Sequence, residues 1–152
     1  MLFRSMKKLQ LGLVAGALSL ITAAAMAQNT PVGKWHTIDE KTKEIKSEIT
    51  ITEAGGVLTG KVSKLLRKDT KQDAVCEECT DARKGKPIIG LEIIRGAKKE
   101  AAEDVWASGK ILDPENGKEY GLKLTPQDGG KKLAVRGSIG PFGRTQTWER
   151  VQ

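Results

Sequence analysis

The sequence predicts an all-β protein, built as an eight-stranded antiparallel up-and-down barrel. Residues 44–52 alternate cleanly, with Ile45, Ser47, Ile49 and Ile51 on one face, which is typical of a half-buried strand. Turn-forming residues separate this segment from its neighbours at short intervals, beginning with Gly55-Gly56. After residue 27 only residues 98–104 have any helical pattern, and they suffice for a single turn.

Strands are expected at 33–38, 44–52, 57–67, 87–95, 103–112, 119–125, 133–139 and 144–151. The clearest hairpin is centred on residues 113–117. Pro114 presets φ for the second turn position, and Asn116-Gly117 tolerates positive φ. Turns are also expected at 96–100, 127–130 and 140–143.

Most of these connections are hairpins, which favours a barrel over a two-sheet sandwich, since sandwiches usually need longer crossovers. The exception is the polar segment 68–86, which is longer than most connections. An eight-stranded barrel is either filled by side chains or holds one small ligand.

Residues 1–27 are predicted to be a signal peptide. Arg4, Lys7 and Lys8 precede an apolar run, and Ala25-Met26-Ala27 is a small-x-small cleavage site. An uncleaved membrane anchor is the alternative, but the apolar run is short for a bilayer span. Residues 28–152 are then expected to form one β-barrel domain, located in the periplasm or secreted, with no stable membrane insertion after cleavage.

Cleavage of the predicted signal peptide would remove Arg4, Lys7 and Lys8 and lower the net charge from +7 to +4. The remaining cations are spread out, with small clusters at Lys98-Lys99 and 83–86. Nucleic-acid binding would require a basic face interleaved with aromatic residues, so none is expected. A solvated surface is the simpler interpretation, and weak attraction to anionic lipid headgroups is the alternative.

Cys76 and Cys79 are the two cysteines of the chain, separated by Glu77-Glu78. A zinc site needs about four ligands, and His36 is the one further candidate, so no metal is expected. A catalytic dithiol would sit at the start of a helix, and two intervening carboxylates would disfavour a thiolate. A structural disulfide in an oxidising compartment is therefore predicted.

No catalytic residue and no cofactor are predicted. His36 is the one histidine, and its neighbour Trp35 would point to the opposite face of a strand. The sequence contains no nucleophile elbow, metalloprotease motif or phosphate-binding glycine loop. A pair of catalytic carboxylates is compatible with the composition, but none can be placed.

The aromatic residues are few, and most are expected to pack in the core. The alternative is that some line a ligand cavity. On that hypothesis the candidate ligand-binding residues are Trp106, Tyr120, Trp148 and Glu92, the last of which interrupts an apolar strand. The aliphatic walls would come from Ile49, Ile51, Leu58, Val62, Leu122, Leu124, Leu133 and Val135.

Several stretches resemble one bacterial family, the exported domain-of-unknown-function family 2147. They are Gly33-x-Trp35, Val75-Cys76-x-x-Cys79, GKILDPENGKEY at 109–120, and Gly137-x-Ile139-Gly140 followed by GRTQTW at 143–148. The resemblance covers essentially all of residues 28–152. It implies a small lipocalin-like or calycin-like barrel, secreted to the periplasm, with no established enzymatic activity and no catalytic residues.

In lipocalins the tryptophan of a Gly-x-Trp motif packs at the closed end of the barrel beneath a late arginine. The resemblance assigns the first role to Trp35 and suggests Arg150 for the second, with Arg144 as the competing partner. Such a cation–π contact would join the first strand to the last, where a barrel must close.

These observations favour a binding protein that holds a small apolar or lipid-like molecule in its barrel. An envelope interaction protein with a filled barrel, which contacts an unidentified protein partner through residues 68–86, is the alternative. An uncharacterised hydrolase or isomerase ranks third, because no acid–base pair can be named.

Overall fold

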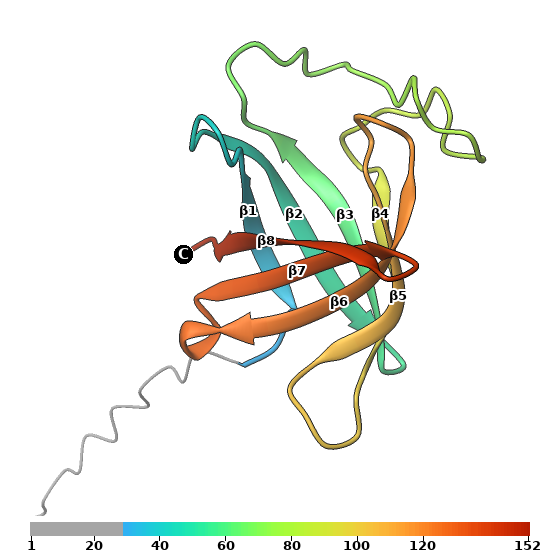
Figure 1. The fold of residues 1–152 in the computed structure, drawn as a ribbon. Coiled ribbons are helices and arrows are strands. Elements are labelled where there is room, and N and C mark those ends of the chain that lie inside the picture. Colours follow the sequence, from blue (N-terminus) through green and yellow to red (C-terminus); the bar gives the residue numbers. More distant parts are fainter. Residues whose placement is uncertain (1–28) are drawn as a thin grey trace, which may run out of the picture.

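The computed structural model describes residues 29–152, and they form a barrel of eight strands (Figure 1). A short 3₁₀ turn, η1, occupies Asp128–Gly130. In chain order the strands are β1 (Gly33–Ile38), β2 (Ile45–Ala54), β3 (Val57–Leu65), β4 (Glu92–Lys99), β5 (Trp106–Leu112), β6 (Glu119–Gln127), β7 (Lys132–Ile139) and β8 (Phe142–Arg150).

Each strand pairs antiparallel with the next, and β8 returns to pair with β1, so the sheet is closed. The closing register places Trp35 opposite Arg150 and His36 opposite Glu149. The prediction of an eight-stranded antiparallel up-and-down barrel is therefore confirmed.

The strand directions define two different ends of the barrel. The β1–β2, β3–β4, β5–β6 and β7–β8 connections lie at one end, which we call the mouth. The chain enters β1 and leaves β8 at the other end, which we call the closed end.

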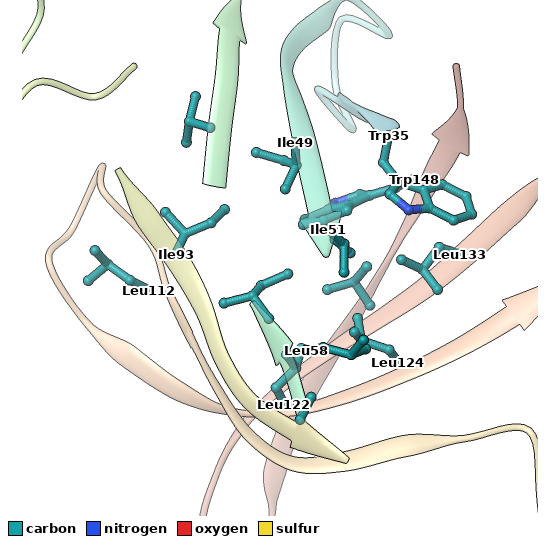
Figure 2. Packing of buried hydrophobic residues seen from close by; sticks show 14 of the residues in the cluster. Trp35, Ile49, Ile51, Leu58, Ile93, Leu112, Leu122, Leu124, Leu133 and Trp148 are labelled. Atoms are coloured by element: carbon teal, nitrogen blue, oxygen red, sulfur yellow. The ribbon is translucent and has the colours of Figure 1, made fainter. Parts of the chain in front are cut away.

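The closed half of the barrel is filled by inward-facing apolar side chains. Figure 2 shows Leu58, Leu122 and Leu124 pointing toward one another in the interior. Alternation along the strands puts these residues on the inner face, where burial stabilises each by about 1.5–3 kcal/mol. Trp35, Ile51 and Leu133 belong to the same cluster and are fully or almost fully buried.

Arg150 seals the closed end by stacking on Trp35. Its guanidinium carbon lies 4.2 Å from the centroid of the Trp35 ring. Nε and Nη1 donate hydrogen bonds to the carbonyl oxygens of Gly130 (2.6 Å) and Val32 (2.8 Å), and Nη2 donates to Thr30 (2.6 Å). Burial lowers the pKa of Arg150, and the three carbonyl oxygens offset this burial by accepting hydrogen bonds from its guanidinium.

Glycine at position 33 is required by this arrangement. Gly33 has φ of +136°, and a Cβ atom there would lie 2.4 Å from Nη1 of Arg150. The Gly-x-Trp spacing thus leaves room for the arginine that covers the tryptophan ring.

The strand expected at residues 87–95 needs correction. β4 begins only at Glu92, because Gly90 adopts φ of +92° and redirects the chain. The turn expected at 96–100 is also wrong. Gly96 lies inside β4 as an extra residue, since Leu58 pairs with Ala97 and Thr59 with Arg95.

The remaining differences are small. β5 starts at Trp106 rather than at residue 103, and β8 starts at Phe142, so the β7–β8 turn is shorter than expected. Residues 98–104 form no helical turn.

The signal peptide predicted for residues 1–27 lies outside the described residues. Within residues 29–152 we find no helix long and apolar enough to span a bilayer.

Replacing Arg150 with alanine should destabilise the barrel by about 3 kcal/mol, because the stack is lost and three carbonyl groups lose their donor. Urea unfolding followed by circular dichroism measures the loss. Arg136→Ala is the matched control, since Arg136 is an exposed β-strand arginine, and its change should stay within about 0.5 kcal/mol. Equal stability of Arg150→Ala and the wild type would contradict this account of closure.

Candidate ligand cavity

A cavity of about 440 Å³ occupies the mouth half of the barrel. Its size lies within the usual range of small-molecule pockets, about 300–1,000 Å³. The large apolar side chains of its wall come from the strands and from Ile88 of the β3–β4 connection. These are Ile49, Val62, Leu65, Ile88, Ile93, Ile111, Leu112, Val135 and Trp148.

Polar and charged side chains also line the cavity, among them Lys46, Thr70 and Gln146. The hydroxyl groups of Thr37 and Ser47, on β1 and β2, lie 2.7 Å apart. The hydroxyl group of Tyr120 accepts a hydrogen bond of 3.0 Å from the side-chain amide of Asn116. A wall that combines large apolar side chains with such hydroxyl groups is suited to hold an apolar molecule that carries a polar end.

Ion pairs surround the mouth and join its connections. Arg67 pairs with Asp39 of the β1–β2 turn at 2.8 Å and approaches Glu115 of the β5–β6 turn at 3.9 Å. Lys46 pairs with the same Glu115 at 3.1 Å. Backbone N–H groups of the β1–β2 turn and the guanidinium of Arg67 lower the pKa of Asp39. The charged rim is therefore internally compensated rather than uniformly positive.

Arg144, on β8, also belongs to this rim and pairs with Glu40. Its position at the mouth separates it from Trp35, which Arg150 covers at the other end. The geometry thus distinguishes the two arginines that the sequence left as alternatives.

Residues 66–91, which we call the strap, connect β3 to β4 and lie over the mouth (Figure 1). Ile88 of the strap contributes to the cavity wall. Cys76 and Cys79 form a disulfide that is fully buried. The strap packs closely on the β5–β6 turn there, because a Cβ atom on Gly117 would lie 1.8 Å from the carbonyl oxygen of Glu78. The disulfide therefore lies in a packed contact rather than at a free loop tip.

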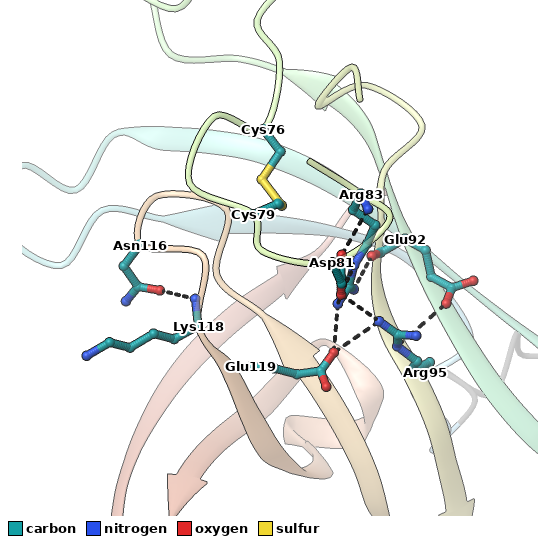
Figure 3. Close-up of polar contacts among 9 residues, drawn as sticks. All are labelled: Cys76, Cys79, Asp81, Arg83, Glu92, Arg95, Asn116, Lys118 and Glu119. Carbon is teal, nitrogen blue, oxygen red and sulfur yellow. Dashed lines mark hydrogen bonds and ion pairs between the residues drawn. A yellow bond between two sulfur atoms is a disulfide. The ribbon is translucent and has the colours of Figure 1, made fainter. Parts of the chain in front are cut away.

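Arg83 fastens the far part of the strap to the barrel (Figure 3). Its guanidinium lies 2.5 Å from a carboxylate oxygen of Asp81 and 2.7 Å from one of Glu119, at the start of β6. Nη1 also donates a hydrogen bond of 2.9 Å to the carbonyl oxygen of Glu92. The hydrogen bonds from Arg83 lower the pKa of Asp81 and of Glu119, and the two carboxylates raise the pKa of Arg83.

The structure brings two of the four candidate ligand-binding residues to the cavity. Tyr120 and Trp148 line it. Trp106 does not, because β5 places it in the filled half, where its ring lies 5.7 Å from Nζ of Lys99. Glu92 does not either. It lies on the outside, 3.9 Å from Arg95, beside a shallow hollow formed by residues of the strap.

Of the eight aliphatic residues predicted to line a ligand site, three lie at the cavity, namely Ile49, Val62 and Val135. The other five residues fill the closed half instead. Inward-facing residues alternate along the whole barrel, so the sequence pattern does not distinguish the filled half from the hollow one. Ile88 was missed because no sequence signal shows where a long connection folds back.

His36 lies on the outer face of β1, opposite Glu48 of β2. Nε2 of His36 is 4.0 Å from Oε2 of Glu48, and this buried carboxylate also accepts a hydrogen bond from Ser63 and pairs with Lys64. The group faces away from the cavity, so it does not belong to the candidate site. Among residues 29–152 no three histidine, cysteine or carboxylate side chains are grouped in a way that would hold a metal ion.

A closed eight-stranded barrel with a sealed end, an arginine stacked on the tryptophan of a Gly-x-Trp segment and a cavity at the other end defines a lipocalin-like fold. The chain belongs to the DUF2147 family, described as uncharacterized proteins conserved in bacteria, whose model matches residues 33–150. No curated protein sequence matches the chain.

One solved structure has the same fold. Its title reads "Protein HP1028 from the human pathogen Helicobacter pylori belongs to the lipocalin family". The two chains superpose with a TM-score of 0.67 at 18% identity, over 80% of this chain and 82% of that one. At this identity the likeness shows the shared barrel and leaves the ligand open.

Arg83→Gln should loosen the strap, because it removes both ion pairs and the hydrogen bond to the Glu92 carbonyl. We expect trypsin to cleave after Lys84 about tenfold faster in this variant, because the strap would open more often once it is released from its packing. Lys71→Gln, which removes an exposed lysine from the same strap, should leave these cleavage rates unchanged. Equal rates in all three proteins would show that Arg83 does not hold the strap.

The same attachment should weaken in acid. Asp81 and Glu119 have lowered pKa values, so their contribution to stability is complete above the ordinary values of 3.8 and 4.5 and is lost as the pH falls through the lowered ones. Carboxyl ¹³C NMR titration should show both groups titrating below these ordinary values. Arg83→Gln should move both titrations upward; unshifted titrations in the wild type would exclude the predicted coupling.

Proposed function

We propose that this protein is a periplasmic or secreted binding protein that holds one small, mainly apolar or lipid-like molecule inside its barrel. The observation that supports this most strongly is the cavity of about 440 Å³ in the mouth half. A barrel filled by side chains throughout would leave no room for a ligand.

The chemistry of the cavity supports an apolar ligand with a polar end. Nine large apolar side chains contribute to the wall, and removal of apolar ligand surface from water is favourable at about 25 cal/mol per Å². The hydroxyl groups of Thr37, Ser47 and Tyr120 can orient a polar group, and the charged side chains are restricted to the rim.

The proposed location is supported by two features of the chain. The predicted signal peptide would direct the protein out of the cytoplasm. The Cys76–Cys79 disulfide is of the kind that persists in oxidising compartments.

The direct experiment is native mass spectrometry of protein purified from the envelope of its own cells. A copurified small molecule, released under denaturing conditions and identified by its mass, would support the proposal. In parallel, the neutral apolar dye N-phenyl-1-naphthylamine should bind with a fluorescence increase and a stoichiometry of one per chain.

Val135→Phe should weaken binding of this dye at least tenfold, because the larger ring projects into the cavity from β7. Ala134→Phe is the matched control. Ala134 is the neighbouring residue on the same strand and faces outward, so dye affinity should be unchanged. Circular dichroism would verify that both variants fold. Equal dye affinity of Val135→Phe and the wild type would contradict binding in the cavity.

A further inference from the structure

The large apolar side chains that are exposed in the described chain all lie at the mouth of the barrel. In residues 29–152 they are Ile45, Leu66, Val75, Ile89, Ile139 and Phe142. Each lies in or next to the β1–β2, β3–β4 or β7–β8 connection. Scattered exposed apolar residues are ordinary, but their restriction to one end of a molecule marks a surface for interaction.

The most exposed pair forms the tip of the β7–β8 hairpin, residues 139–142, which we call the tip. Ile139 lies directly opposite Phe142 in the strand register, across the turn of Gly140 and Pro141. Their exposed fractions are 54% and 80%. Gly140 adopts φ of +57°, which permits this tight turn. The tip therefore presents two apolar side chains on a short, well-defined projection.

The tip continues the inner wall of the cavity toward the solvent. Ile139 follows Val135 and Gly137 at the period-two spacing of β7, and both of those residues line the cavity. On β8 the same spacing runs from Gln146 through Arg144 to Phe142. A molecule that enters or leaves the cavity along this wall would pass the tip.

Positive charge flanks the tip. No aspartate or glutamate occurs from residue 129 to residue 148, whereas Arg136 and Arg144 lie on either side of the turn. The Arg136 guanidinium packs against Gly143, where a Cβ atom would lie 2.5 Å from Nη2, so its charge is held beside Phe142. An apolar tip with adjacent arginines is the arrangement of segments that rest in a membrane interface.

The neighbouring β1–β2 turn adds to this charge. Lys41, Lys43 and Glu44 are exposed there, while Asp39 is engaged with Arg67 and Glu40 with Arg144. Two exposed lysines against one exposed carboxylate leave a net positive charge that can meet anionic headgroups.

We propose that the tip docks reversibly on the interfacial region of an anionic lipid bilayer, with Phe142 and Ile139 among the upper acyl chains and Arg136 and Lys41 among the headgroups. A bilayer fits this surface better than a protein groove does, because the exposed apolar residues belong to separate connections at one end of the barrel. Docking in this orientation would bring the cavity mouth to the lipid surface. The docking itself does not depend on which ligand the cavity holds.

The test is cosedimentation of the envelope-purified protein with vesicles of phosphatidylcholine and phosphatidylglycerol (3:1) and of phosphatidylcholine alone. We expect binding to the anionic vesicles, reduced at least tenfold by Phe142→Ser and further by the additional change Ile139→Ser. Thr52→Ser, at an exposed position near the closed end, is the matched control and should bind like the wild type.

A second variant reports the depth of the tip. Phe142→Trp places an indole at the tip. Its fluorescence should be quenched by anionic vesicles whose lipids carry bromine atoms on the acyl chain near the headgroup. Dye binding in the cavity, measured with N-phenyl-1-naphthylamine, should be unchanged in Phe142→Ser, which separates failure of docking from failure of the proposed function.

Three results would overturn the proposal. These are absence of binding to anionic vesicles, binding that Phe142→Ser does not weaken, and a protein dimer in solution that Phe142→Ser dissociates. The last result would assign the tip to contact with a second copy of the chain.

Discussion

The stack of Arg150 on Trp35 is the contact on which the rest of the structure depends. A sheet of eight strands has two open edges unless its first and last strands meet, and exposed edges are prone to association. β1 and β8 pair through only two residue pairs, and the stacked residues Trp35 and Arg150 form one of them. The guanidinium also binds the chain that enters β1 and the turn before β7, so one side chain holds three segments of the closed end.

Closure at one end permits a cavity at the other. The closed half buries its apolar residues against one another and provides a stable floor, on which Trp148 and Val135 form the boundary with the hollow half. The mouth is held by different interactions, namely ion pairs between connections, a buried disulfide and the Arg83 contacts. Such polar and covalent links fix the rim without filling the interior. The barrel thus combines a rigid base with an accessible pocket.

The sequence predicted the fold well because local rules act at every strand. Alternation, tight turns and glycine positions gave the number and order of the strands, and the family resemblance pointed to Trp35 and Arg150. The β4 boundary was misplaced because an apolar run alone does not reveal that Gly90 leaves the extended conformation. Of the aromatic residues predicted to bind a ligand, Tyr120 and Trp148 line the cavity and Trp106 does not, since its depth along the barrel depends on strand register. Their role in ligand binding stays a prediction. The contributions of Ile88, Arg67 and Arg144 depend on how separate connections meet in space, which has no local signature in the sequence.

The central claim is that the mouth half of the barrel receives an apolar molecule while the closed half stays filled. Methyl NMR of the protein during titration with lipid extracted from the envelope tests this most directly. The account predicts that signals of Val62, Ile93 and Ile111 shift and saturate, while those of Leu58, Leu124 and Leu133 stay in place. Unchanged spectra throughout, or shifts confined to the closed half, would contradict it.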